Sequence, residues 1–182
     1  MTKFLLIICL FLSACSSVVQ DRQVTAQLAR EVEIVIPYPE FFMEYRGEIL
    51  LTTEYEGTKK SILIAEEIRK DSLALQVMSV SYINLFKANY TGNGLQTEYQ
   101  VPQSLLPPVN QSLLDIMLSY GTENVVKKSL PSGYVLIQQQ DLRLIKDNSG
   151  KIIYSIEYDP QTRLVTRISN YEFGYCIDIK YL

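Results

Sequence analysis

Short apolar segments separated by turn residues run through most of this chain, and they constrain its fold more than any other feature. From Tyr45 onward turn signals recur about every ten residues, and the Gly-Asn-Gly stretch at 92–94 is the strongest of them. Between the turns apolar and polar residues alternate, as at Leu73, Leu75 and Val77. Such alternation gives each strand one buried face. Its repetition is typical of an antiparallel sheet, sandwich or barrel.

Nine strands are expected, five before a helical stretch and four after it. We therefore expect a mainly β (α+β) fold, a curved antiparallel half-open barrel of about nine or more strands. A mid-chain helical insert would cover an apolar cavity on the concave face, the natural place for a hydrophobic ligand. The expected strands are 47–55, 61–69, 72–80, 84–92, 95–101, 133–145, 151–159, 164–172 and 173–181.

The helical insert is expected over residues 112–120. Ser112 would be its N-cap, with Asp115 in the capping-box position, and Gly121 would end it. A second short helix would be capped by Thr122. The first helix has little polar surface, so it must be buried on most sides or contact lipid. It supplies candidate residues for the lining or lid of the cavity, with plain core packing as the alternative: Leu113, Leu114, Met117, Leu118 and Tyr120.

The chain begins with the apolar run 4–12, which follows Lys3. A helix needs roughly 20 apolar residues to cross a bilayer, so this run suits a signal peptide instead. The stretch 12–15, Leu-Ser-Ala-Cys, resembles a bacterial lipobox. In such signals the cysteine thiol receives diacylglycerol and the chain is cut before it. An ordinary signal with a chance cysteine is the alternative reading.

This resemblance divides the chain into a signal peptide (1–14), a lipidated Cys15 with a tether (15–36), and a β domain (37–182). Several acyl chains on one terminus attach a protein firmly to a bilayer. Ser16 stands where an aspartate would retain a lipoprotein in the inner membrane, so it resembles the class directed to the outer membrane. We therefore expect a protein anchored by lipid at the periplasmic face of the outer membrane.

Composition argues against several classes of function. The chain has no histidine, so it lacks the commonest general base and metal ligand. No nucleophile–base pair, metal set or phosphate loop is visible, so we predict no enzyme, cofactor or metal. The formal charge is −3 and no basic block occurs, which argues against nucleic acid. Loss of the signal and acylation of Cys15 would leave Cys176 alone, without a disulfide partner.

Two pairs of charged residues are candidates for catalysis or for anion binding. Glu66 and Glu67 are adjacent on an expected strand, so they face opposite sides and cannot flank one substrate. Arg143 and Arg163 could bind an anionic head group, but solvated strand positions are the favoured interpretation.

The order of features from Tyr38 to Leu182 resembles a family of bacterial lipoproteins with no assigned function, which is itself similar to LolB, the outer-membrane lipoprotein acceptor. Each motif is weak alone, and their order carries the resemblance. The shared features are Tyr38-Pro39, Gly47 before ILLTTEYEG, the LAL at 73–75, Leu85-Phe86, NYTGNGL at 89–95, LLDIMLSY at 113–120 and LPSGY at 130–134.

The resemblance implies a monomeric half-open barrel whose hydrophobic cavity handles lipid or lipoprotein without chemistry. Members of the family are often encoded beside aryl polyene biosynthesis genes and a LolA-like carrier. This implies a hydrophobic, lipid-like ligand, with a LolA-like periplasmic carrier as a partner. A structural or assembly accessory of the envelope that binds a protein partner is the alternative.

One loop departs from the LolB-like pattern. LolB-like proteins expose a leucine in a Pro-Leu-Gly setting between the third and fourth strands. Here Val80, Ser81 and Tyr82 occupy those positions. Either Tyr82 and Ile83 supply the apolar loop tip, or the membrane-insertion step is altered.

Overall fold

One large antiparallel sheet holds most of the described chain, which in this computed structural model comprises residues 17–182. Its eleven strands are β1 (Ser17–Asp21), β4 (Tyr45–Tyr55), β5 (Thr58–Arg69), β6 (Ser72–Ser79), β7 (Asn84–Thr91), β8 (Gly94–Tyr99), β9 (Val135–Gln138), β10 (Leu142–Lys146), β11 (Ile152–Tyr158), β12 (Val165–Asn170) and β13 (Tyr175–Tyr181). Their spatial order is β1-β8-β7-β6-β5-β4-β13-β12-β11-β10-β9.

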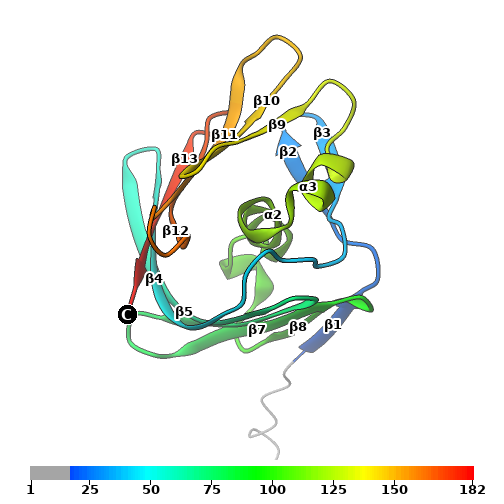
Figure 1. Cartoon of the computed structure of the whole chain (residues 1–182). Helices are drawn as coiled ribbons and strands as arrows, with labels where there is room; N and C mark the ends of the chain where they lie inside the picture. Colours follow the sequence, from blue (N-terminus) through cyan, green and yellow to red (C-terminus); the bar gives the residue numbers. More distant parts are fainter. Residues whose placement is uncertain (1–16) are drawn as a thin grey trace, which may run out of the picture.

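The sheet is curved but not closed. Its edge strands, β1 and β9, do not pair with each other. Figure 1 shows its concave side wrapped around the helices. The expected mainly β, antiparallel fold is therefore confirmed, as an open sheet with more strands than predicted.

The C-terminal strand β13 joins the two halves of the sheet. It pairs with β12 on one side and with β4 on the other, where Tyr175 lies opposite Tyr55 and Tyr181 opposite Ile49. One half is the run β4–β8 with β1 at its edge, and the other is the run β9–β12. The long-range contact between β4 and β13 therefore makes the sheet continuous.

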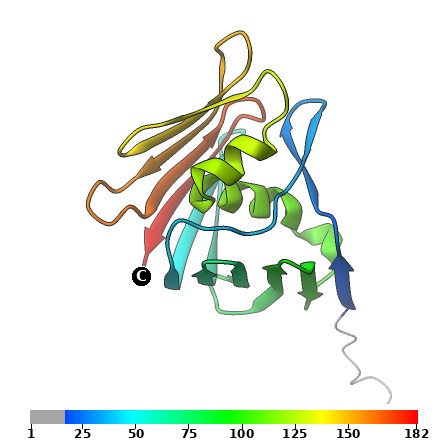
Figure 2. The ribbon, with the colours of Figure 1, turned by 45° about the vertical axis from the view of Figure 1, so that its right-hand side comes forward.

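Two α-helices lie on the concave side. They are α2 (Val109–Tyr120) and α3 (Glu123–Ser129), preceded by a short 3-10 helix, Gln103–Leu105. Figures 1 and 2 show α2 between the sheet and a hairpin made of β2 (Thr25–Ala29) and β3 (Val32–Val35).

The helix ends follow the sequence signals only in part. The predicted N-cap at Ser112 is wrong, because α2 begins at Val109, directly after Pro108. Pro108 has no N–H of its own to satisfy, and its carbonyl accepts from the N–H groups of Gln111 and Ser112. The stop at Gly121 is confirmed by its N–H, which donates to the Met117 carbonyl. The cap at Thr122 is also confirmed, since its Oγ1 accepts from the Val125 N–H of α3.

Two segments differ from the sequence prediction. Residues 133–145, predicted as one long or bent strand, form β9 and β10 joined by a turn. Residues 17–35 lie within the predicted tether (15–36), yet they form β1, β2 and β3. Strand β1 pairs with β8, and the hairpin buries Ala26, Leu28 and Ile34. The partner of β1 and the helix α2 against which the hairpin packs are both distant in sequence, so a local pattern does not reveal these contacts.

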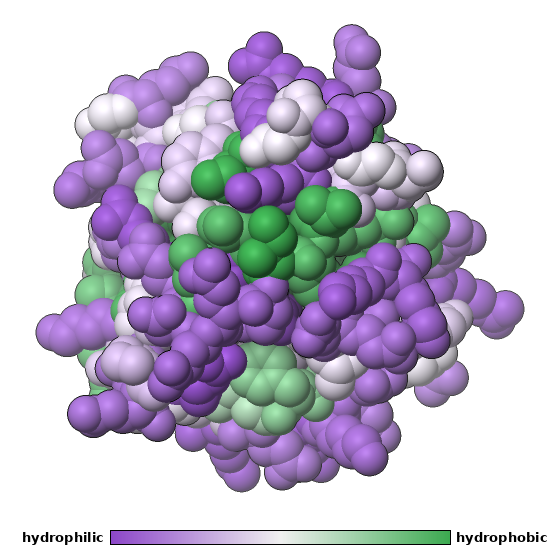
Figure 3. All heavy atoms as spheres, turned by 45° about the horizontal axis from the view of Figure 1, so that its top comes forward, coloured by the Kyte–Doolittle hydropathy of each residue, from purple (hydrophilic) through white to green (hydrophobic). Residues whose placement is uncertain are grey.

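Hydrophobic side chains also reach the surface. Figure 3 shows them gathered in a band across the middle of one face, between hydrophilic rims. We refer to this feature below as the apolar band.

Candidate functional site

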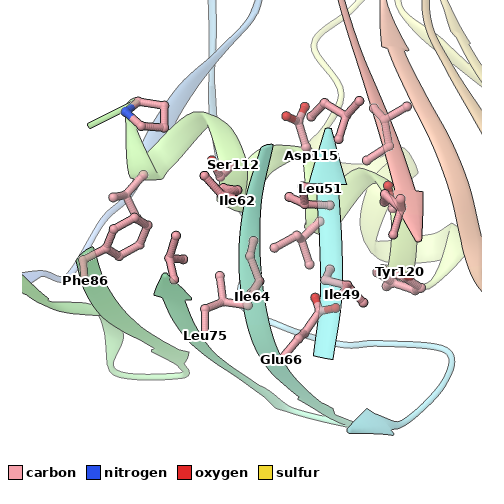
Figure 4. A pocket seen from close by; sticks show the side chains of 18 residues that line it. Ile49, Leu51, Ile62, Ile64, Glu66, Leu75, Phe86, Ser112, Asp115 and Tyr120 are labelled. Atoms are coloured by element: carbon pink, nitrogen blue, oxygen red, sulfur yellow. The ribbon is translucent and has the colours of Figure 1, made fainter. Parts of the chain in front are cut away.

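An apolar pocket lies between α2 and the concave face of the sheet (Figure 4). Its volume is about 70 Å³. The sheet contributes alternate residues of its strands, which therefore share one face. They come from β4 to β7, β12 and β13: Ile49, Leu51, Ile62, Ile64, Glu66, Leu75, Val77, Phe86, Ile168, Ile177 and Ile179.

The side of α2 that faces this wall is unexpectedly polar. Ser112, Asp115 and Ser119 line the pocket together with Ile116. They are spaced three and four residues apart, so they form one stripe along the helix. A polar stripe normally faces water. Here it faces an apolar wall, which marks this surface of α2 as the candidate site.

The cavity residues predicted from the sequence separate into two groups. Tyr120 lines the pocket. The other four, Leu113, Leu114, Met117 and Leu118, are not among the lining residues; each is at most 2% exposed and belongs to the main core. The sequence pattern identified the right helix, but the apolar residues it favoured lie on the other sides of that helix.

Asp115 is buried and hydrogen-bonded. Its Oδ1 accepts from the Tyr175 hydroxyl at 2.7 Å. Desolvation by burial raises the pKa of Asp115 to about 7, although hydrogen bonds from Tyr175 and Tyr154 act to lower it. This role differs from the capping-box position predicted for Asp115, because α2 begins earlier than expected.

Glu66 is the second buried carboxyl of the pocket. It lies on β5 opposite Gly47 and Leu75, and its side chain forms no hydrogen bond or ion pair with any other described residue. Burial raises its pKa to about 7. Its neighbour Glu67 lies on the opposite face and pairs with Arg69 at 2.6 Å. The two carboxylates do face opposite sides, but the sequence did not reveal that one of them enters an apolar pocket.

Ser119 has a buried hydroxyl without a partner. Its Oγ is fully enclosed and makes no hydrogen bond, one of two such atoms among residues 17–182. Its backbone carbonyl is occupied, since it accepts from the Tyr158 hydroxyl at 2.7 Å. An unsatisfied buried hydroxyl costs free energy unless something else completes it.

Arg143 corrects the sequence interpretation, which favoured a solvated strand position. It is 2% exposed, and its Nη1 donates to the carbonyls of Leu118 and Gly121 at 2.6 and 3.0 Å. A cation at a helix C-terminus satisfies the last carbonyls and complements the helix dipole. Arg143 therefore holds the end of α2. Arg163 instead lies in the β11–β12 turn, with its guanidinium 5.4 Å from the Tyr158 ring centre.

Tyrosines fix the same helix to one half of the sheet. Tyr181 on β13 meets Tyr120 at 2.7 Å between hydroxyl oxygens, and Tyr154 and Tyr175 meet at 3.1 Å. The amide of Gln111 on α2 donates to Tyr154 at 3.0 Å. Every hydrogen bond that joins α2 to the large sheet, within residues 17–182, reaches β10, β11, β12 or β13. Toward β4–β8 the helix forms no hydrogen bond within these residues.

The predicted loop tip lies away from the pocket, in the turn between β6 and β7. Tyr82 and Ile83 are 61% and 63% exposed, and Val80 beside them is also exposed. Tyr82 has a φ of 60°, and the Ser79 hydroxyl accepts from the backbone N–H of Ile83. The turn therefore presents its apolar side chains to solvent. Cys15 and Ser16, the predicted lipidation and sorting residues, lie outside the described residues.

One protein-family model matches this chain. It is described as "Protein of unknown function (DUF3261)" and matches residues 49–182. The matched range begins within β4 and includes α2 and every residue that lines the pocket. No curated protein matches the chain. Within residues 17–182, no helix has the length and apolarity needed to cross a membrane.

Proposed function

This chain belongs to the DUF3261 family, and we propose that it is an outer-membrane-anchored lipoprotein that accepts a hydrophobic chain between α2 and the sheet. The cargo would be a lipid, a lipoprotein acyl chain or an aryl polyene lipid, received from a soluble LolA-like carrier and placed in the membrane. No covalent step is required. The similarity to LolB and the lipobox in the sequence support this proposal.

The observation that carries the proposal is the one-sided attachment of α2. The helix is hydrogen-bonded to β10–β13, whereas no hydrogen bond formed by residues 17–182 holds it to β4–β7. Separating α2 from β4–β7 therefore breaks no hydrogen bond between them. A chain inserted there would lay its methylenes against the aliphatic side chains of β4–β7, which makes this wall the natural entry for a hydrophobic ligand.

The pocket must widen to hold such a chain. Its volume of about 70 Å³ is smaller than the cavity of about 150 Å³ that admits benzene in an engineered protein. Each methylene moved from water into an apolar site contributes about 0.8 kcal/mol. A long chain thus provides enough free energy to offset the separation of α2 from the wall.

The register of the sheet supports a membrane-facing end. Ser17 lies opposite Tyr99, Tyr99 opposite Phe86, and Phe86 opposite Val77. The N-terminal end of β1 and the β6–β7 turn are therefore at the same end of the sheet, about 14 Å apart across three strand spacings. One residue separates Cys15 from Ser17. A lipid on Cys15 and the tip formed by Tyr82 and Ile83 would approach one bilayer together.

Anchoring is tested with Cys15→Ala in the full chain. We expect this variant to remain unlipidated and to leave the outer-membrane fraction, because the thiol that would carry diacylglycerol is gone. The measurement is fractionation of membranes with detection of incorporated fatty acid. Cys176→Ala is the matched control and should fractionate normally. Sedimentation of Cys15→Ala with the outer membrane, as in the wild type, would contradict the anchor.

Chain binding is tested by filling the pocket. Ile116 is half-buried where α2 meets the pocket, so Ile116→Trp should occupy the space that a chain needs. We expect the affinity of the full chain for the neutral apolar dye N-phenylnaphthylamine to fall at least about tenfold, or about 1.4 kcal/mol. Val125→Trp places the same ring on a half-buried position of α3 outside this pocket, and should bind as the wild type does. Equal affinities for folded Ile116→Trp and wild type would refute the pocket as the binding site.

A second candidate function is a structural or assembly accessory of the envelope that binds a protein partner. The small volume of the pocket and the apolar band favour it (Figure 3). Exposed apolar patches often mark protein–protein contacts. Under this alternative neither Ile116→Trp nor Val125→Trp would alter lipid binding, because no chain would enter the pocket.

A further inference from the structure

The pocket contains acidic and hydroxyl groups but no cation. Glu66 and Asp115 are each 4% exposed, and no ion pair formed by residues 17–182 includes either of them. Arg143 is buried as well, yet its Nη1 donates to the backbone carbonyls of Leu118 and Gly121 at the end of α2. The protein itself therefore supplies no positive charge to these carboxyls.

The hydrogen-bonding capacity of the pocket is mostly acceptor capacity. An ionised carboxylate only accepts, and a serine hydroxyl can both accept and donate. The Tyr175 hydroxyl is already committed to Asp115. The Oγ of Ser119 has no partner, and no ion pair or side-chain hydrogen bond formed by residues 17–182 reaches the carboxyl of Glu66. Buried polar groups normally have a hydrogen-bond partner, so these two groups define what a bound molecule has to offer.

The arrangement places this polarity at the ends of an apolar surface. In the view of Figure 4, Glu66 lies at one end of the pocket and Asp115 with Ser112 at the other, and Leu51 and Ile64 lie between them. A chain on this surface would have its methylenes against the aliphatic wall. Its polar end would meet a carboxyl group.

Resting on the proposed function, we propose that the pocket selects chains whose buried end is an ammonium or a hydroxyl group, because these groups donate hydrogen bonds. It rejects chains that end in a carboxylate. An ammonium group would pair with ionised Glu66, and a hydroxyl would donate to Glu66 or Ser119. A carboxylate would bring an uncompensated negative charge into a site removed from water that contains two carboxyl groups and no cation, which is strongly unfavourable.

The titratable groups around Glu66 add no charge to the pocket near pH 7. Tyr45 on β4, Tyr120 on α2 and Tyr181 on β13 are the groups that interact electrostatically with it. Burial raises the pKa of all three, so they stay neutral near pH 7. None of them can neutralise a ligand carboxylate.

The test compares dodecylamine, dodecanol and dodecanoate at pH 7, each below its critical micelle concentration. They compete with the neutral dye N-phenylnaphthylamine for the purified full chain. We expect the amine and the alcohol to displace the dye at about tenfold lower concentration than the carboxylate. Glu66→Gln should reduce the advantage of the amine over the carboxylate by about tenfold. Glu67→Gln, on the opposite face, is the matched control and should keep the wild-type order.

Ser119→Ala provides a second variant that removes only the unpaired hydroxyl. It should weaken the binding of dodecanol a few-fold and leave the binding of dodecylamine close to that of the wild type. Circular dichroism would verify that each variant is folded. Equal binding of the three compounds to the wild type, or an unchanged preference in Glu66→Gln, would overturn the selectivity and leave the chain-binding function intact. Failure of all three to displace the dye would overturn both.

Discussion

Replacing Arg143 by leucine is expected to lower the free energy of unfolding by about 3 kcal/mol, since a hydrogen bond to a charged group contributes roughly 1.5–3 kcal/mol. The guanidinium donates hydrogen bonds from Nη1 to the carbonyls of Leu118 and Gly121, and from Nε to the Gln138 side chain at 2.6 Å. Leucine fills part of the volume but leaves those acceptors buried and unsatisfied. Urea titration followed by circular dichroism measures the change.

Arg163→Leu is the matched control for this substitution. Arg163 is half-buried in a turn and contacts the ring of Tyr158, so its loss should cost at most about 1 kcal/mol. The two arginines looked equivalent in the sequence, and the comparison measures how much the position at the end of α2 contributes. An Arg143→Leu protein as stable as Arg163→Leu would show that the contacts to α2 do not matter.

The second large effect is a loss of stability as pH rises. The ordinary pKa values are 4.5 for a glutamate and 3.8 for an aspartate, and burial raises those of Glu66 and Asp115 to about 7. Between these values the folded protein holds protons that the unfolded chain has lost, so stability falls with increasing pH. Each pKa unit corresponds to about 1.4 kcal/mol, so each carboxyl should remove about 3 kcal/mol between pH 4 and pH 8.

Glu66→Gln isolates one of these contributions. The amide has nearly the same shape but does not ionise, so the variant should match the wild type at pH 4 and exceed its unfolding free energy by about 3 kcal/mol at pH 8. Exposed acids contribute equally to the pH dependence of both proteins, so their contributions cancel in the difference between the two unfolding free energies. Glu67→Gln should leave the pH dependence unchanged. Identical stability curves for wild type and Glu66→Gln would mean that Glu66 is not desolvated in solution.

Much of the sheet could be predicted from the sequence, because alternation and turn chemistry are local signals. The strands through Leu73–Val77 and the turn at Gly94 lie where they were expected. Strands β1, β2 and β3 were not predicted because they are short. Strand β1 is stabilised by its pairing with β8, and the β2–β3 hairpin by its packing against α2. A strand of four or five residues gains little from its own sequence.

The candidate site was predicted less well than the fold. The sequence indicated α2, but it favoured the leucines and Met117, which fill the core on the other sides of the helix. One signal was available: Ser112, Asp115 and Ser119 recur at helical spacing inside an otherwise apolar segment. The burial of Glu66 and Arg143 could not be inferred in the same way, because each depends on which element packs over its strand.

The position of β13 has a consequence for how the molecule is made. Its seven residues are the last strand of the chain, and they alone connect the half that contains β4–β8 to the half that contains β9–β12. Contacts between residues so distant in sequence form slowly, because a long loop must close before they contribute. A chain that is synthesised from its N-terminus cannot complete the sheet until β13 has been made. The two halves of the sheet therefore stay unjoined until β13 has been synthesised, which makes their joining a late step of folding.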